Sequence, residues 1–335
     1  MNSDHPAPRG TESSAPVRTR SLSPPRRAAF IALLAIALAA LFVTTYTLAL
    51  GNPVPHGIPI AVVGDPASRE ALVQRVTQVA GGPNFRAYDS LPAALDAVDW
   101  QAVYAALDLT ANPPTLYVAS AAGASVARTL QRLATLDPDV SIVDTHPLGG
   151  NDPNGLDIFY LMLGATILGF VTIFQVRANA KPLSLRQWTI FVLALAIGGT
   201  LILTLVAGPL LRRLELPVPE VWAILTLQLV AAASFASLMS VLIGPWAIVP
   251  TWGFFVILGN SSSGGAVAPP LLPEPIAFVS QWLPSGATVT ALRNAVYFPD
   301  HQHWQPIAVL ATWAIVLFFA MLAVSWRRGA SPGMP

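Results

Sequence analysis

The sequence has no cysteine among its 335 residues, a single lysine beside 17 arginines, and few charged side chains of either sign. The absence of cysteine excludes disulfides, thiolate metal sites and a lipid anchor on cysteine. Charged residues make up 10% of the chain, whereas soluble domains carry about 25%. Because 54% of the residues are hydrophobic, the composition is that of a membrane protein.

The net charge is +1 at neutral pH, which gives no reason to expect a nucleic-acid partner. No Ser-His-Asp set, metal triad or carboxylate pair within an apolar run stands out, so the sequence predicts neither an enzyme nor a metal or cofactor site. His301 and His303 lie near Asp300, but they have no third strong ligand, and we interpret them as part of a loop. The near absence of ionisable residues within the apolar runs argues against an ion-coupled transporter.

The first 50 residues predict a tail followed by a membrane anchor. Residues 1–27 are rich in Pro, Ser, Thr and Arg, so we expect a disordered cytoplasmic tail. Residues 28–50 are uncharged, and the run is longer than the roughly 7–15 apolar residues of a signal peptide, so it predicts a retained transmembrane helix. The arginines that precede it place the N-terminus in the cytoplasm.

Residues 51–155 predict an extracytoplasmic α/β domain inserted between the first two transmembrane helices, because charges return and short β-rich runs alternate with helical patterns. We interpret it as a folded spacer or docking module, with a small-molecule binding domain as the alternative. The predicted strands are Ile58–Gly64, Phe85–Tyr88, Val103–Leu109, Thr115–Ala121 and Val140–Val143, and the predicted helices are Pro66–Ala80, Leu91–Val98 and Gly123–Leu136.

Residues 156–328 predict a five-helix membrane domain. Ile158–Val176 and Trp188–Leu211 are the second and third spans, and Pro306–Trp326 is the last. The uncharged run Trp222–Leu258 corresponds to about 55 Å of helix at about 1.5 Å per residue, which is enough for two crossings. We expect the turn between them near Gly244-Pro245, because proline cannot continue a regular helix.

Six transmembrane helices also agree best with the distribution of basic residues. With six, both termini are cytoplasmic, including the predicted tail 329–335, and most Lys and Arg near the spans lie on that side. The cytoplasmic set is Arg18, Arg20, Arg26, Arg27, Arg177, Lys181, Arg186, Arg327 and Arg328, and the outer set is Arg212, Arg213 and Arg293.

Residues 259–304 predict a re-entrant or interfacial segment, because no apolar run within them is long enough to cross a membrane. Pro275–Leu283 is apolar but too short to span. Ser285 is suited to cap a short helix over Gly286–Tyr297. This segment opens with a stretch rich in glycine and serine, and that stretch is the candidate site.

Glycine and serine supply a flexible backbone and small hydroxyls where a helix ends at membrane depth, so the stretch is either a structural break or a substrate contact. It lacks the Gly-Lys-Ser/Thr sequence of a phosphate-binding loop, which excludes nucleotide hydrolysis by that route. Arg293 is placed to pair with Glu274 or Asp300, or to attract an anionic headgroup. The candidate residues of the substrate path or re-entrant loop are Gly259, Asn260, Ser261, Ser262, Ser263, Gly264, Gly265 and Arg293.

Several short blocks carry a family resemblance over about residues 28–328. They are Thr115–Gly123, Pro147-Leu148, Asp152–Gly155, Leu258–Gly265, Leu272-Pro273, Leu283-Pro284 and Ala291–Arg293. With one span, an outer α/β domain and five further spans, the chain resembles the type-2 ABC transporter permease family. It is most similar to the YhgE/Pip (phage infection protein) branch of actinobacterial type.

The resemblance implies one half of an exporter, a homodimer or heterodimer in the lipid bilayer with a separate ATPase subunit. The loop Arg177–Gln187 between spans two and three is short for a coupling element, so the sequence leaves open whether an ATPase partner exists. We expect a multi-pass protein of the bacterial plasma membrane that acts as a permease-like subunit exporting a lipid, peptide or hydrophobic compound. The alternative is an envelope interaction protein without transport activity that docks partners or phage through its outer domain.

Overall fold

The computed structural model describes residues 24–51, 54–70, 83–134, 139–180, 182–211 and 214–329. Contacts divide the chain into two units, residues 1–40 and residues 41–335. Helix α1 (Pro24–Leu50) extends across that division and begins earlier than predicted. Residues 24–27, expected in a disordered tail, form its first turn, where proline is well tolerated. The rest of the predicted tail lies outside the described residues, as do residues 330–335.

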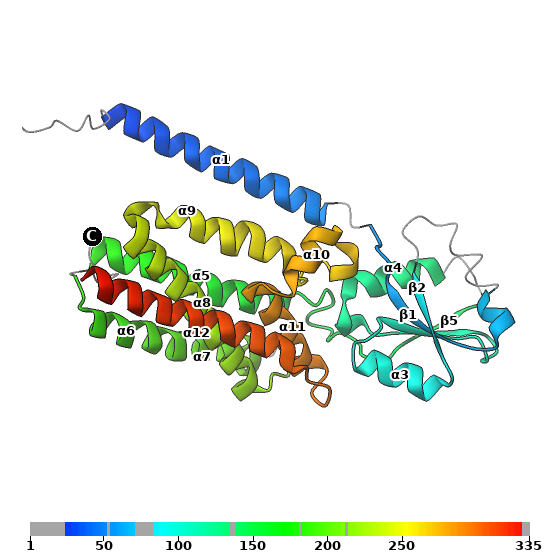
Figure 1. Ribbon diagram of the computed structural model, residues 1–335. Coiled ribbons are helices and arrows are strands. Elements are labelled where there is room, and N and C mark those ends of the chain that lie inside the picture. The colour runs from blue at the N-terminus through cyan, green and yellow to red at the C-terminus, as the bar shows by residue number, and fades with distance from the viewer. Residues whose placement is uncertain are drawn as a thin grey trace, which may run out of the picture. The chain divides into compact units, whose positions relative to one another are not determined.

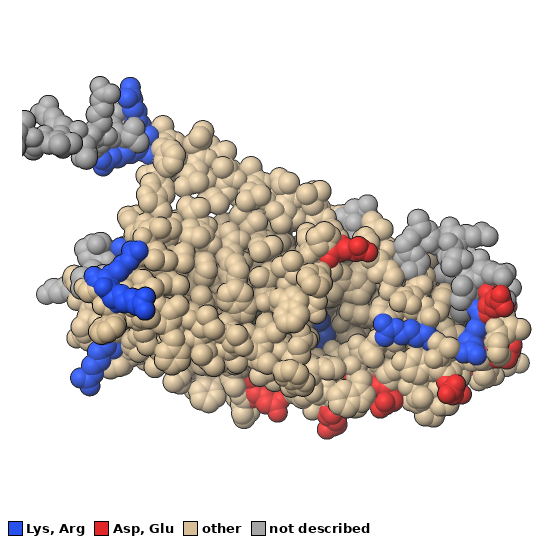
Figure 2. Space-filling model, viewed as in Figure 1, with Lys and Arg blue, Asp and Glu red and all other residues tan. Residues whose placement is uncertain are grey.

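Five helices of the described chain are long and apolar enough to cross a membrane. They are Pro24–Leu50, Asp157–Asn179, Leu185–Leu210, Val218–Asn260 and Trp304–Arg328. The protein is therefore a helical membrane protein with several spans. On the face seen in Figure 2, the flank of the helical bundle within residues 41–335 carries almost no charged side chains, as contact with lipid requires.

Helix α5 (Asp157–Asn179) is regular, whereas the next span is interrupted twice by π-helical turns. This span consists of α6 (Leu185–Ala194), η2 (Leu195–Gly199), α7 (Thr200–Leu205) and η3 (Val206–Leu210). A π-turn widens the helix and leaves a carbonyl without its usual partner. In η2 that need is met from the neighbouring helix, because the indole nitrogen of Trp222 donates to the Ile197 carbonyl over 2.9 Å.

The fourth candidate span folds back on itself. Helix α8 ends at Ile243, before Gly244 with φ +60°, where the Gly-Pro pair predicts a turn. Beyond the turn the chain returns along α8, so that Phe235 stacks on Phe254 with ring centroids 5.1 Å apart (Figure 1). The parts of this span are α8 (Val218–Ile243), η4 (Gly244–Ala247), α9 (Ile248–Thr251) and the π-helical η5 (Trp252–Asn260).

Three short helices and one long helix follow. They are η6 (Pro269–Leu271), α10 (Glu274–Ser280), α11 (Pro284–Tyr297) and α12 (Trp304–Arg328). The prediction that Ser285 caps α11 is wrong, because Leu283 is the N-cap and Ser285 lies in the first turn. Proline at the first helical position explains the earlier start, since its fixed φ suits a helix and its missing N–H costs nothing there.

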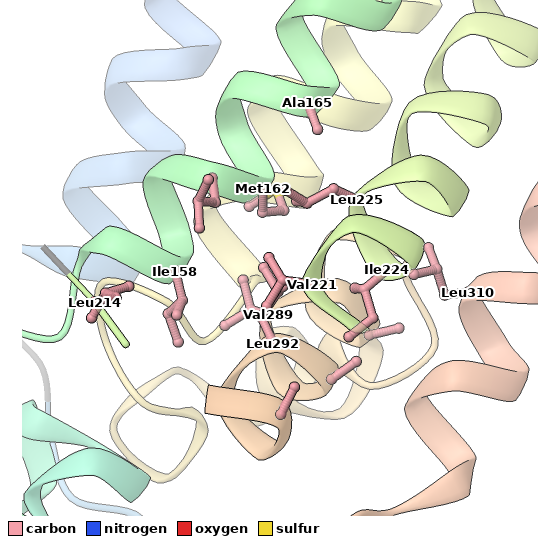
Figure 3. Close-up of a cluster of buried hydrophobic side chains, with 14 residues drawn as sticks. Ile158, Met162, Ala165, Leu214, Val221, Ile224, Leu225, Val289, Leu292 and Leu310 are labelled. Atoms are coloured by element: carbon pink, nitrogen blue, oxygen red, sulfur yellow. The ribbon is translucent and has the colours of Figure 1, made fainter. Parts of the chain in front are cut away.

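Apolar side chains of α5, α8, α11 and α12 form the core of the half of the bundle that Figure 3 shows. Met162, Val221 and Leu225 are fully buried there and lie between the helices. A second cluster fills the other half around Trp188, whose indole nitrogen donates to the hydroxyl of Ser237 over 3.0 Å. Helix α8 packs chiefly against α5 and α12 and is the central element of the bundle.

Two arginines fix the common end of three helices. Arg177 near the end of α5 donates to the Ser240 carbonyl over 3.2 Å, and Arg328 at the end of α12 donates to the Val241 carbonyl over 2.9 Å. The last carbonyls of a helix have no partner within it, and cations are favourable at that end. The C-terminal ends of α5, α8 and α12 therefore lie on the same side of the bundle.

The chain between α1 and α5 forms one mixed sheet with strand order β2-β1-β3-β4-β5. β1 is parallel to β2 and β3, β4 is antiparallel to β3, and β5 is parallel to β4. The elements are β1 (Pro59–Val63), β2 (Asn84–Tyr88), α3 (Leu91–Asp99), β3 (Ala105–Asp108), β4 (Thr115–Val118), η1 (Ser120–Ala122), α4 (Ala124–Ala134) and β5 (Ser141–Asp144). Most of the predicted helix Pro66–Ala80 lies outside the described residues.

Segments from the far end of the chain complete both faces of this sheet. Helix α4 covers one face together with residues 267–272, which follow the glycine- and serine-rich stretch. Helix α3 covers the other face together with Phe298, which follows α11. The Ala268 amide also donates to the Ser125 hydroxyl over 3.0 Å. The sheet and the bundle consequently form one compact unit rather than two separate cores.

Candidate functional site

The glycine- and serine-rich stretch Gly259–Gly265 is where the returning arm of the hairpin ends. Gly259 and Asn260 are the last residues of η5, the next two residues are still helical, and the chain then bends at Gly264 with φ +74°. All seven residues are buried except Gly265, which is half-buried. Irregular backbone at this point therefore lies inside protein, the setting in which a membrane protein tolerates it.

The serine hydroxyls of this stretch bond to the backbone of their own turn. Ser261 donates to the Ile257 carbonyl over 2.6 Å, and Ser262 donates to the Leu258 carbonyl over 2.7 Å. Ser263 donates to the Asn260 carbonyl over 2.9 Å. Hydroxyls used in this way bend and stabilise a helix end. The geometry therefore favours the structural-break interpretation of the serines over direct contact with a substrate.

The glycines allow close approach of neighbouring elements. A Cβ atom at Gly265 would lie 2.6 Å from the ring of Phe159 in α5, and one at Gly259 would lie 2.7 Å from the Ser285 hydroxyl in α11. Real Cβ atoms do not approach so closely. Glycine at these two positions is thus required for the packing of η5 and the following bend against α5 and α11.

Arg293 is the charged member of the candidate set, and it retains free hydrogen-bonding capacity. Its side chain is buried, 7% exposed, and its Nη2 atom donates to the Gly264 carbonyl over 2.8 Å. The predicted pairing with Glu274 or Asp300 is wrong, because both carboxylates are exposed and neither reaches it. In the part of the chain that the structure describes, no carboxylate lies within 4.0 Å of the guanidinium, and its other N–H groups have no acceptor.

Burial determines the electrostatics around Arg293. Desolvation lowers the pKa of Arg293, opposed by the nearby hydroxyls of Tyr104 and Tyr297. Burial raises the pKa of Tyr104, although Arg293 acts in the other direction. Burial also raises the pKa of Tyr297, with a further contribution from the Asp152 carboxylate. Both phenols are therefore neutral at physiological pH and do not neutralise the guanidinium.

A small cavity of about 10 Å³ adjoins Arg293, enough for about one water molecule. Its lining combines the first turn of α4, Ala124 and Ser125, with Gly264 and Tyr297. It lies where the sheet layer, the glycine- and serine-rich stretch and α11 meet. Figure 2 shows a hollow between the uncharged bundle and the charged sheet layer with basic atoms at its floor.

A much larger open cleft of about 800 Å³ lies on the other side of Tyr297. It is lined by the loop Gly149–Asn151, by Gly208-Pro209 at the end of η3, and by Leu216 and Val296. The lining combines apolar side chains with exposed backbone and the carboxylate of Glu215, a mixture that suits an amphipathic molecule. Tyr297 borders both spaces and so separates the cleft from Arg293.

A buried hydrogen-bond network that was not predicted from the sequence joins three helices. The Gln228 side chain in α8 donates to Thr166 in α5 over 2.7 Å and accepts from Thr288 in α11 over 2.9 Å. All three side chains are fully buried. A glutamine in the middle of an apolar helix is a signal that was available, since a polar group there needs partners from neighbouring helices.

Buried polar atoms without partners gather on α11 and η5. Among the described residues, the Asn260 Oδ1 atom, the Ser285 hydroxyl and both polar atoms of the Asn294 amide make no hydrogen bond. Such groups are costly in a dry interior. Water or a ligand at this end of the bundle would satisfy them.

The two histidines of the loop before α12 pack against one tryptophan of the sheet layer. His301 meets Trp100 edge-on with centroids 4.9 Å apart, and His303 Nε2 lies 3.0 Å from the Trp100 carbonyl. Within the described ranges, no three His, Asp or Glu side chains are grouped as metal ligands. The pair thus has a packing role at the junction of loop and sheet.

Taken together, the site offers one buried guanidinium beside a small cavity, an amphipathic cleft next to it, and a helix break held by its own hydroxyls. It can bind and orient an anionic or amphipathic molecule. No protein-family model, curated protein or solved structure matches this chain.

Proposed function

We propose that this protein is the permease-like subunit of an export system, similar to type-2 ABC transporters, for a lipid, peptide or hydrophobic compound. The observation that carries this proposal is the helix break Gly259–Gly265, buried within the bundle and close to the open cleft that ends at Tyr297. Helices broken at membrane depth occur in transporters, where they are buried in protein or line the substrate cavity. The bundle supplies the membrane-spanning scaffold, and the sheet layer projects from one end of it.

The proposal includes six crossings with both termini in the cytoplasm. The two arms of the hairpin count as separate crossings in this arrangement. The common end of α5, α8 and α12 supports it, because Arg177 and Arg328 both bind carbonyls of α8 there. Basic residues concentrate at cytoplasmic ends. The sheet layer is then extracytoplasmic, and the turn at Gly244 is cytoplasmic.

The absence of cysteine makes this topology directly testable, because each introduced cysteine is unique. Asp96→Cys lies on the sheet layer, Pro245→Cys at the hairpin turn and Asn179→Cys at the end of α5, and all three positions are exposed. A membrane-impermeant maleimide should label Asp96→Cys in intact cells and the other two only after permeabilisation. Labelling of Pro245→Cys in intact cells would contradict the six-crossing arrangement.

The transport function is tested by the ATPase partner that it requires. Tagged protein extracted in mild detergent from cross-linked membranes of its host should recover a nucleotide-hydrolysing subunit detectable by mass spectrometry. Arg186→Glu, exposed at the start of α6, should reduce that recovery, whereas Arg86→Glu on the sheet layer should not. Repeated recovery without any ATPase would count against the export proposal.

A docking function is the second candidate, and one observation favours it. Edge strand β5 exposes the apolar side chains of Ile142 and Val143, 37% and 43% exposed. An apolar edge strand is a template for pairing with another chain. If docking is the function, Ile142→Lys should abolish partner capture, while Gly265→Leu should leave it unchanged.

A further inference from the structure

Arg293 is a buried cation for which the described chain provides no counter-charge. Its guanidinium has five N–H donors, of which one meets the Gly264 carbonyl at 2.8 Å. The neighbouring phenols of Tyr104 and Tyr297 are kept neutral by burial. A buried charge without a partner is strongly disfavoured, and a water molecule does not neutralise it. This arrangement calls for an anion.

The adjoining cavity supplies further donors and a size limit. Helix α4 begins at Ala124, and the N–H groups of its first turn have no acceptor within their own helix. These groups favour negative charge through the helix dipole. The cavity leaves about 10 Å³ in which the centre of a water-sized sphere can lie, so it is sized for one small ion rather than a large anion.

We propose that Arg293 and the first turn of α4 form a binding site for a single small anion of about the size of chloride. The anion would tie three elements together, namely α11, the bend at Gly264 and the sheet layer. The proposal stands whether or not the protein transports anything.

The purified full-length protein in a non-ionic detergent provides the test. Its thermal unfolding, followed by tryptophan fluorescence, is measured in sodium chloride and in sodium gluconate at equal concentration, since gluconate is too large for the cavity. Chloride should raise Tm saturably by at least about 3 °C above gluconate, because a ligand that binds only the folded state stabilises it. Equal Tm values in the two salts would overturn the proposal.

A matched pair of arginine variants separates the site from general salt effects. Arg293→Gln should lose the chloride-dependent rise, with half-saturation weakened at least about tenfold. Arg86→Gln is the control, because Arg86 also donates to one backbone carbonyl, that of Ala102, but is exposed. It should respond as the parent does. An unchanged chloride response in Arg293→Gln would overturn the proposal.

Ala124→Glu keeps the test decisive if Arg293→Gln does not fold. Ala124 is the first residue of α4 and lines the cavity, so a glutamate there is favoured by the helix and places a carboxylate near Arg293. This variant should have the Tm of the chloride-saturated parent in gluconate and show no further rise with chloride. A full chloride response in Ala124→Glu would also overturn the proposal.

Discussion

Phe235 and Phe254 lie stacked, with ring centroids 5.1 Å apart and an interplanar angle of 12°, although the turn at Gly244 separates them in the chain. Phe255 meets the same Phe235 ring edge-on at 5.7 Å. Within a membrane, helices gain no hydrophobic energy from one another and depend on packing of this kind. The phenylalanines therefore hold the two arms of the hairpin together.

Replacing Phe235 by alanine should loosen the hairpin. In a double-mutant cycle of Phe235→Ala and Phe254→Ala, we expect a coupling energy of about 0.5–1.5 kcal/mol, as for other aromatic pairs. The measurement is unfolding by SDS in mixed micelles. Phe319→Ala is the control, since that ring is 61% exposed on α12. Additive effects of the two hairpin variants would show that the stacking contributes nothing.

The close approach of Gly265 to α5 leads to a second prediction. Gly265→Ala places a methyl group 2.6 Å from the ring of Phe159, so the two segments must move apart. Overpacking of this kind costs about 1–3 kcal/mol of unfolding free energy. Gly253→Ala in the same hairpin arm meets nothing within 4 Å and should be neutral. If export is the function, Gly265→Leu should also impair it, and unchanged efflux would remove the break from the substrate path.

The buried network around Gln228 predicts that removing its glutamine and removing its threonines destabilise the protein to different extents. Thr166 donates to the Met162 carbonyl, and the Thr288 hydroxyl, which shares its one proton between Gln228 and the Pro284 carbonyl, can donate to the latter alone. Gln228→Met therefore leaves both hydroxyls bonded. Removing both threonine hydroxyls instead leaves the Gln228 amide without hydrogen-bond partners. Each buried polar group left unsatisfied lowers the free energy of unfolding by about 1–3 kcal/mol. Unfolding in mixed micelles should show that the double variant Thr166→Val/Thr288→Val is much less stable than Gln228→Met. The reverse order would mean that the network does not act through satisfaction of Gln228.

The buried phenols predict a loss of stability at alkaline pH. Burial and the Asp152 carboxylate raise the pKa of Tyr297 above its ordinary value, so the unfolded chain ionises first as the pH rises. The contribution is fully present below about pH 10 and declines above it, towards the raised pKa of the folded state. With one lysine in the chain, tyrosines dominate this range. Tyr297→Phe should therefore lose less Tm than the parent between about pH 9 and 11.

Tyr160→Phe is the control for this pH series, because Tyr160 is 54% exposed on α5. It should follow the parent over the whole range. If the Tm of Tyr297→Phe falls with pH as steeply as that of the parent, the Tyr297 hydroxyl does not contribute to the loss of stability at alkaline pH.

Features set by local chemistry could be predicted from the sequence. The Gly244-Pro245 pair correctly predicts the end of α8, because proline stops a helix wherever it falls. The segments with alternating β-rich runs correspond to all five strands, although the strands are shorter than predicted at most ends. Apolar length alone identifies the long helices, because the bilayer sets that length.

Features set by contacts between distant segments could not be predicted. Arg293 has carboxylates nearby in sequence, yet its partner is the carbonyl of Gly264, brought close only by the bend after η5. The candidate serines bond to their own turn, and only the geometry distinguishes that role from contact with a substrate.

The completion of the sheet core by residues 267–272 on one face and Phe298 on the other has a mechanical consequence. Each face of the sheet packs against a segment that lies between η5 and α12 in the chain. A force that a bound partner applies to the sheet would therefore be transmitted through these packed contacts to α11 and to the break at Gly259–Gly265. The sheet layer is therefore mechanically coupled to the membrane helices rather than joined to them by the chain alone.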